Sequence, residues 1–291
     1  MSGQAWHLAV LGQPIAHSKS PLLHGAAYTV LGLPWSYEAI EVGSDDLAGF
    51  IRSRDDTWRG LSLTMPLKRE ILPLLDSADH LVELVASANT VLFDNTVLFG
   101  CGRVRGFNTD VYGITAALRA AGVKTFGLVQ ILGAGATAAA AIAAAAELGA
   151  DTVAVATRSP QKAGPLIALA ERFELDVAVG GFDLRSRNRT PDVVVSTLPG
   201  GTALDVEFPV ALRESVPLLD VAYDPSPTPL AESWFQAGGQ VISGLEMLVH
   251  QALMQVRVFV NRDPEVALPQ EGTVLQAMRA SIGLDASPAS A

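Results

Sequence analysis

Cysteine is almost absent from this chain, since Cys101 is the only one among 291 residues. A single cysteine excludes internal disulfide bonds and any metal site built from several thiolates, and it fits a reducing compartment. The amino-terminal sequence also lacks a basic region followed by an apolar stretch and a small-residue cleavage site. We therefore predict a cytoplasmic protein with no secretory signal and no bound metal.

Basic residues and long apolar runs are scarce as well. The chain has 20 Lys and Arg against 30 Asp and Glu, a net charge of -10, which argues against nonspecific nucleic-acid binding because that affinity depends on neutralised phosphates. The longest unbroken apolar run, Ala138 to Ala146, is about half of the roughly 20 residues that a membrane-spanning helix needs. We expect neither nucleic acid nor a membrane as partner, and anionic ligands would need local positive groups.

What the sequence does contain is a regular alternation of strand-like and helix-like segments, which predicts an α/β protein with two domains. We predict strands around residues 6–12, 35–42, 59–66, 128–132, 152–159, 191–199 and 217–225, and helices around 20–31, 44–53, 66–85, 110–122, 245–260 and 272–284. Residues 90–100 alternate across Asp94-Asn95 and predict a hairpin. The small-residue tail, 285–291, is expected to be disordered.

The sequence "ILGAGATA", residues 131–138, has the spacing of a dinucleotide-binding turn. Gly133 allows the tight turn, Gly135 lets backbone N–H groups approach a pyrophosphate, and Ala138 lets the helix pack close to the strand. Ala134, Ala136 and Thr137 complete the predicted cofactor loop. The alternative is a glycine turn in an ordinary strand-to-helix connection.

The tip of the next predicted strand indicates which dinucleotide is bound. An NAD enzyme usually has an acidic residue there, whereas this chain has Thr157, Arg158 and Ser159, with Asp151 placed before the strand. An arginine flanked by hydroxyls suits a 2′-phosphate, so we predict NADP as the cofactor. Alternatively, Arg158 is a solvated loop residue.

A nicotinamide enzyme that reduces a carbonyl needs a proton donor, and none of the five histidines lies in an obvious catalytic sequence context. Packing or capping roles are favoured for all of them. Better candidates are Lys68, which follows a predicted strand, and Asp110, at the start of a predicted helix. The alternatives are surface exposure for Lys68 and helix N-capping for Asp110.

Several motifs together resemble those of one family. In order, they are "GQPIAHSKSPLLH", "LTMPLK", "SANT", "GFNTD", "LGAGATA", "YDPSPTPL" and "SGLEMLVHQA", and they resemble the motifs of shikimate dehydrogenase over nearly the whole chain. The resemblance implies a substrate-binding domain of residues 1–110, completed by returning helices in 241–291, and a Rossmann-like NADP-binding domain of residues 111–240. The implied active site lies in the cleft between them. The implied reaction is reversible hydride transfer from NADPH to 3-dehydroshikimate, which gives shikimate for aromatic amino acid biosynthesis.

The same resemblance implies a role for each matching residue. Ser18 and Ser20 would bind the substrate carboxylate, and Lys68 and Asp110 would be the catalytic pair. The ring hydroxyls would be bound by Thr64, Asn89, Asp110 and Gln251, with Tyr223 lining the pocket and Gly244 and Met247 near the nicotinamide. Alternatively, Asn89 is a turn residue, and Tyr223 and Met247 are ordinary core residues.

The chain also departs from the family pattern. Ala136 replaces a glycine that is frequent in the family, Thr157 stands where asparagine is common, and Ser196 to Pro199 read "STLP" instead of an "NATP"-like segment. None of these changes affects the catalytic pair. Two alternatives stay open: a quinate/shikimate or aminoshikimate dehydrogenase paralogue, and a catalytically silent NADP-binding regulatory protein. The expected assembly is a monomer or a homodimer.

Overall fold

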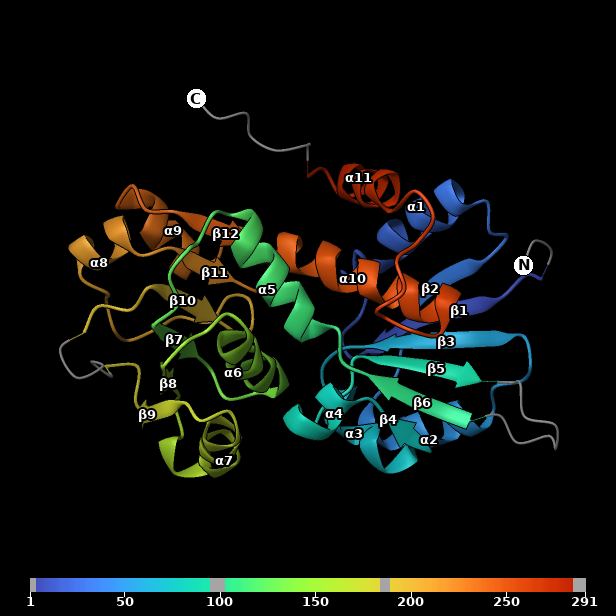
Figure 1. Cartoon of the computed structure of the whole chain (residues 1–291), viewed down its shortest axis with the longest axis horizontal. Helices are drawn as coiled ribbons and strands as arrows, with labels where there is room; N and C mark the ends of the chain where they lie inside the picture. Colours follow the sequence, from blue (N-terminus) through green and yellow to red (C-terminus); the bar gives the residue numbers. More distant parts are fainter. Residues whose placement is uncertain (1–3, 95–102, 184–188, 285–291) are drawn as a thin grey trace. The chain divides into compact units, whose positions relative to one another are not determined.

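The computed structural model describes residues 4–94, 103–183 and 189–284 of the chain. Within these ranges, helices alternate with strands that form two six-stranded sheets, which confirms the predicted α/β class (Figure 1). The chain divides into two compact units, the first made of Met1–Thr109 and Leu248–Ala291 and the second of Asp110–Met247. Each unit contains one of the sheets.

The first unit is built on a mixed sheet with the strand order β2-β1-β3-β5-β6-β4. Its strands are β1 (His7–Gly12), β2 (Ser36–Glu41), β3 (Trp58–Leu63), β4 (Ser77–Ala78), β5 (Thr90–Asp94) and β6 (Arg103–Phe107). Its helices are α1 (Ser20–Leu31), α2 (Ser44–Arg52), α3 (Leu67–Glu70), α4 (His80–Val85), most of α10 (Gly244–Asn261) and α11 (Glu271–Ser281). Strand β5 runs antiparallel to both β3 and β6.

Side chains alternate between the two faces of this sheet, as the period of two in a strand requires. In β5, Leu92 packs in one core with α1, α10 and α11, which lie beside one another (Figure 1). Its neighbours Val91 and Phe93 pack on the opposite face with residues of α2, α3 and α4. Strand β5 is therefore buried on both faces of the sheet.

The second unit is built on an all-parallel sheet with the strand order β12-β11-β10-β7-β8-β9. Its strands are β7 (Leu128–Leu132), β8 (Thr152–Ala156), β9 (Asp176–Gly180), β10 (Val193–Ser196), β11 (Leu218–Asp220) and β12 (Val241–Ser243). Its helices are α5 (Asp110–Ala120), α6 (Ala136–Glu147), α7 (Gly164–Arg172), α8 (Val210–Ser215) and α9 (Pro229–Gln236). Every residue of β7 and β10 is buried, which explains their mostly apolar sequences, LVQIL and VVVS. No helix in the described ranges is long and apolar enough to cross a bilayer.

The single helix predicted over residues 66–85 is wrong. The chain there forms α3, a 3₁₀ turn at Leu72–Leu74, the short strand β4 and then α4. The cause is backbone pairing with β6, because the N–H of Asp79 donates to the carbonyl of Gly106 over 2.9 Å. The side chain of Asp79 then caps α4 by accepting the N–H of Val82 over 2.7 Å.

The predicted hairpin and tail are only partly within the described residues. Strand β5 ends at Asp94, and it pairs antiparallel with β6, which begins at Arg103 and was not predicted. The second half of the expected hairpin, residues 95–100, lies outside the described residues, as does the tail 285–291.

A buried histidine lies at the centre of the first unit. His24 has no exposed surface, its ring stacks on Tyr37 at 3.9 Å between centroids, and its Nε2 lies 3.2 Å from Oε1 of Gln255. Burial lowers the pKa of His24 from 6.5 to about 3, and the hydrogen bond to Gln255 offsets this only in part. The imidazole is therefore neutral in the folded protein at neutral pH.

This burial predicts a pH dependence of stability. In the unfolded chain His24 takes up a proton as the pH falls through 6.5, while the folded protein does not until about pH 3. Stability is thus complete above pH 7 and falls with pH below it. When the pH is lowered from 7.5 to 5.5, the free energy of unfolding of the parent should fall by about 1.4 kcal/mol more than that of a His24→Gln variant. Urea unfolding at both pH values measures the difference. Equal pH dependence of the two proteins would contradict the buried neutral imidazole.

Candidate active site

The two predicted carboxylate-binding serines lie in the connection from β1 to α1. Ser20 is the first residue of α1 and is 5% exposed, and its N–H donates to Oγ of Ser18 over 3.3 Å. Proline follows at the first turn of the helix, where a missing N–H costs nothing. The structure therefore places the Ser18 hydroxyl against the backbone N–H of Ser20 at the start of a helix.

Thr64 and Lys68 follow β3. The N–H of Thr64 donates to the carbonyl of Leu11 over 2.9 Å, and a Cβ at Gly12 would collide with the Thr64 methyl group. Glycine at the end of β1 is thus what lets Thr64 approach that strand. Lys68 lies in α3 and is half-buried.

Asn89 has a dense set of hydrogen bonds inside the first unit. Its Oδ1 accepts the N–H of Thr109 over 2.9 Å, and its Nδ2 lies 2.9 Å from Oγ1 of Thr109 and 3.1 Å from Oε1 of Gln251. Asn89 is 1% exposed and Gln251 is 6% exposed. The structure thus joins two predicted substrate-binding residues that are far apart in sequence.

The two predicted catalytic residues are attached to the same region through the backbone. The carbonyl of Lys68 accepts the N–H of Ala88 over 2.8 Å, directly before Asn89. Asp110, which is 2% exposed, begins α5 and directly follows Thr109. Lys68 is therefore hydrogen-bonded to the residue before Asn89, and Asp110 follows the residue whose N–H donates to Asn89.

The cofactor loop predicted in the second unit has the strand-turn-helix context that its sequence requires. Gly133 follows β7 with a φ of +112°, and a Cβ there would collide with Oγ1 of Thr197. Gly135 precedes the first residue of α6 and has open space where its Cβ would be. The loop of Gly133, Ala134, Gly135, Ala136 and Thr137 thus leads into a helix amino terminus, where anions bind.

The predicted phosphate-binding residues follow β8. Thr157 is buried, and its Oγ1 accepts the N–H of Ser159 over 3.3 Å, so its hydroxyl shapes the turn. Arg158 lies at the exposed position between them. No residue in the described part of the chain forms an ion pair with Arg158, so its guanidinium is available for an anionic ligand.

The remaining predicted residues lie after β11 and β12. Tyr223 is half-buried, and burial, together with the nearby charge of Asp224, raises the pKa of its phenol. Gly244 begins α10, where a Cβ would collide with the carbonyl of Val221. Met247, on the first turns of the same helix, is 7% exposed. Gly244 therefore permits close contact between the start of α10 and the segment that leads to Tyr223.

Sequence reasoning missed residues that hold these positions. Thr109 is 2% exposed and contacts both Asn89 and Gln251, and its place directly before Asp110 in "GFNTD" was the available signal. Near Tyr223, the hydroxyl of Thr228 donates to the carboxylate of Asp220 while accepting the N–H of Ala231 over 3.1 Å. Burial raises the pKa of Asp220, and the hydrogen bond from Thr228 partly offsets this rise.

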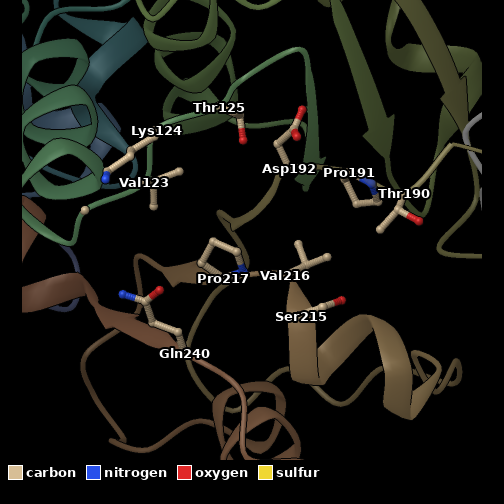
Figure 2. A pocket seen from close by; sticks show the side chains of 11 residues that line it. Val123, Lys124, Thr125, Thr190, Pro191, Asp192, Ser215, Val216, Pro217 and Gln240 are labelled. Atoms are coloured by element: carbon tan, nitrogen blue, oxygen red, sulfur yellow. The ribbon is translucent and has the colours of Figure 1, made fainter.

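A pocket of about 370 Å³ in the second unit lies at the amino-terminal ends of its strands (Figure 2). It is lined by residues 122–125, 190–192, 215–217 and Gln240, segments that come just before β7, β10, β11 and β12. The predicted cofactor residues come just after these strands or after β8. Because ligands of parallel sheets bind at the carboxyl ends of the strands, this pocket is not the candidate cofactor site.

Comparison with known proteins identifies the family. Residues 10–91 match the model of the shikimate dehydrogenase substrate binding domain. A shikimate dehydrogenase (NADP(+)) from Methanopyrus kandleri is 31% identical over 291 residues, an alignment that covers 94% of this chain and 96% of the relative. The chain belongs to the shikimate dehydrogenase family. The resemblance predicted from its ordered motifs is confirmed.

Solved shikimate dehydrogenases have the same fold. The enzyme from Mycobacterium tuberculosis is 37% identical with a TM-score of 0.78, covering 94% of this chain and 99% of that one. The enzyme from Thermus thermophilus, solved in complex with NADP(H) and shikimate, is 32% identical with a TM-score of 0.76, covering 95% and 99%. The family likeness therefore includes both units of the chain.

The conformation of Gly133 predicts a large difference between two glycine substitutions. Gly149→Ala introduces a side chain at a φ of +86° in open space, so it should cost about 1–2 kcal/mol of stability from backbone strain alone. Gly133→Ala adds a collision with Thr197, whose hydroxyl donates to the carbonyl of Leu132 over 2.8 Å. It should cost about 1 kcal/mol more in urea unfolding. Equal losses of unfolding free energy in the two variants would show that Thr197 moves away from the new Cβ at little cost.

Proposed function

We propose that this protein catalyses the reversible NADP-dependent reduction of 3-dehydroshikimate to shikimate, a step of aromatic amino acid biosynthesis. The observation that carries the proposal is the nearly full-length similarity to NADP-dependent shikimate dehydrogenases, at 31% identity for the Methanopyrus kandleri enzyme. The local geometry of the candidate residues supports it, because each predicted group lies in a setting suited to its role.

The first unit provides most of the groups proposed to bind the substrate, and Asp110 and Tyr223 belong to the second unit. The hydroxyls of Ser18 and Ser20 are proposed to bind the carboxylate, and the Ser18 hydroxyl lies 3.3 Å from the backbone nitrogen of Ser20. The ring hydroxyls are assigned to Thr64, Asn89, Asp110 and Gln251, with Tyr223 as a further pocket residue. Amide groups suit a polyol because they both donate and accept hydrogen bonds. The Asn89–Gln251 hydrogen bond, 3.1 Å long, supports this assignment because it fixes the orientation of both amides.

Lys68 and Asp110 are proposed to handle the proton that the reaction consumes or releases. The chemistry that bound NADPH supplies is a hydride for the ring ketone carbon. The ketone oxygen then needs a proton, and the ammonium group of Lys68 is the proposed donor, with Asp110 sharing in proton handling. In the oxidation of shikimate the same amine accepts the proton from the hydroxyl.

The second unit contains residues that fit NADP. The loop of residues 133–137 has no side chain larger than threonine and opens α6, so backbone N–H groups can reach the pyrophosphate. Arg158 is proposed to bind the 2′-phosphate, flanked by Thr157 and Ser159, and Met247 and Gly244 are proposed to lie at the nicotinamide. No acidic side chain occupies residues 157–159 to bind a free ribose 2′-hydroxyl.

The cellular setting is also part of the proposal. A single cysteine in the sequence fits the reducing cytoplasm, where this biosynthetic step would take place. The protein is proposed to act as a monomer or a homodimer. Size-exclusion chromatography with light scattering decides between them, since the chain mass is 30.5 kDa.

The test of the proposed function is a rate assay with purified protein. Absorbance of NADPH should fall when 3-dehydroshikimate is added, and NADP reduction should follow addition of shikimate. Quinate in place of shikimate, and NADH in place of NADPH, serve as the comparison substrates. Absence of turnover with 3-dehydroshikimate and NADPH would overturn the proposal, and a higher kcat/KM for quinate would reassign the substrate.

Substitution of the proposed proton carrier should affect turnover more than binding. Lys68→Ala should lower kcat by roughly 10²- to 10⁴-fold, the scale of general acid–base catalysis, with a smaller change in the Kd of shikimate. Arg69→Ala is the matched control, because it removes an exposed positive charge from the same helix. Near-parent turnover of Lys68→Ala would remove this residue from the mechanism.

Substitution of Arg158 should affect one cofactor only. Loss of a charge-assisted hydrogen bond to phosphate costs about 1.5–3 kcal/mol, so Arg158→Ala should lower kcat/KM for NADP roughly ten- to over a hundredfold. The value for NAD should barely change, because NAD has no 2′-phosphate. Arg172→Ala, in the last turn of α7, controls for net charge at fixed ionic strength. Equal losses for both cofactors would contradict a phosphate contact.

A further inference from the structure

The peptide group between Leu132 and Gly133, where the chain enters the candidate cofactor loop, is held from both sides. Its carbonyl accepts the backbone N–H of Thr197 and also the Thr197 hydroxyl, each over 2.8 Å. Its N–H, which belongs to Gly133, donates to the carbonyl of Ala156 over 2.8 Å. Because β7 lies between β8 and β10 in the sheet, this one peptide group is hydrogen-bonded to the ends of both neighbouring segments.

Of these three hydrogen bonds, the one from the Thr197 hydroxyl is the one that the sheet does not require. The two backbone bonds continue the parallel pairing of β7 with β10 and with β8. The hydroxyl bond depends on the side chain, and Thr197 is the second residue of "STLP", the segment that departs from the family pattern. As a second donor, the hydroxyl uses the remaining lone pair of the Leu132 carbonyl.

Gly133 is what admits the hydroxyl at this place. It has a φ of +112°, and a Cβ there would collide with Oγ1 of Thr197, so the hydroxyl lies on the side of the turn where a side chain would be. Peptide groups are planar and only φ and ψ separate one from the next. The direction in which the backbone N–H groups of residues 134–137 point therefore depends on how the Leu132–Gly133 peptide is held.

The hydrogen bond to Leu132 also decides what the Thr197 hydroxyl can offer to a ligand. Its one proton is donated to the carbonyl, so toward a ligand its oxygen can only accept. The oxygens of a pyrophosphate at neutral pH only accept as well, and two acceptors form no hydrogen bond. Any contribution of this hydroxyl to dinucleotide binding must therefore pass through the Leu132–Gly133 peptide.

We propose that Thr197 is a positioning residue for the cofactor: its hydroxyl fixes the peptide group from which the loop of residues 133–137 turns toward the pyrophosphate. This inference rests on the proposed function, which assigns that loop to NADP. The 2′-phosphate is assigned to Arg158, at the end of a different strand, β8. The hydroxyl should therefore matter for binding of the pyrophosphate and not for binding of the 2′-phosphate.

The experiment compares Thr197→Ser with Thr197→Ala, which both remove the methyl group and differ only in the hydroxyl. Thr197→Ala should raise the Kd of NADPH by about three- to tenfold, the effect of losing one neutral hydrogen bond, while kcat at saturating cofactor changes less than about twofold. Thr197→Ser should restore the parent Kd. The Kd of adenosine 2′-monophosphate, which lacks the pyrophosphate, and the Kd of shikimate should not change in either variant.

Ser215→Ala is the matched control, because it removes a hydroxyl that donates to a backbone carbonyl, that of Ala211, over 2.7 Å at the amino-terminal ends of the strands. It should keep the parent Kd of NADPH. Thr197→Val, which keeps the shape of the side chain, takes the place of Thr197→Ala if that variant does not fold. Equal Kd values for NADPH in the Ser and Ala variants would overturn the inference, as would an equal rise for adenosine 2′-monophosphate. A parent protein that does not bind NADPH would instead overturn the proposed function.

Discussion

The buried side-chain amide of Asn89 is the constraint on which the substrate half of the molecule depends. A buried amide without partners costs about 1–3 kcal/mol, so the chain must supply them. It does so from two segments far away in sequence, through Thr109 and Gln251. The backbone carbonyl of Asn89 adds two more contacts by accepting the N–H of Leu63 over 2.8 Å and the amide of Gln255. One residue thus fixes the ends of β3 and β6 and the middle of α10 relative to one another.

The candidate cofactor half depends on a different kind of constraint. There the absence of a side chain matters, since Gly133 adopts a φ of +112° and Gly244 approaches the carbonyl of Val221 closely. A buried polar pair in this unit, Asp220 and Thr228, lies where the chain leaves β11. Hydrogen bonds between buried polar groups therefore organise the first unit, and glycine backbone contacts organise the candidate cofactor loop of the second, which fits the ligand proposed for each.

The sequence predicted those features whose causes are local. The turn at Gly133 and Gly135 is legible because the spacing of its glycines, the apolar strand before it and the alanine-rich helix after it are contiguous. The position of Ser18 and Ser20 at a helix start could be predicted for the same reason, since the helix begins at Ser20. In such places propensity, pattern and turn chemistry agree.

Features with distant causes were not predictable from local pattern. The segment 66–85 reads as one helix, yet the backbone N–H of Val104 donates to Asp76 over 2.7 Å and that of Asn108 donates to Asp79 over 3.2 Å, which ties the segment to β6. Thr109 reads as a residue before a helix, and only the fold shows that it completes the hydrogen bonds of Asn89. The contacts of Ser62 with Tyr37 and with Gln255 likewise join positions that are separated by many residues in the sequence. In each case tertiary hydrogen bonds override the local preference.

Amide hydrogen exchange at Thr109 tests the central claim most directly. Its N–H donates to Oδ1 of Asn89 over 2.9 Å in a buried setting, so in the parent it should exchange as slowly as the amides of the central strand β3. In an Asn89→Ala variant the exchange of Thr109 should accelerate by orders of magnitude, while amides of β7 in the second unit keep their parent rates. Unchanged protection of Thr109 in that variant would contradict the account, because it would mean that the segment is held in place without the Asn89 amide.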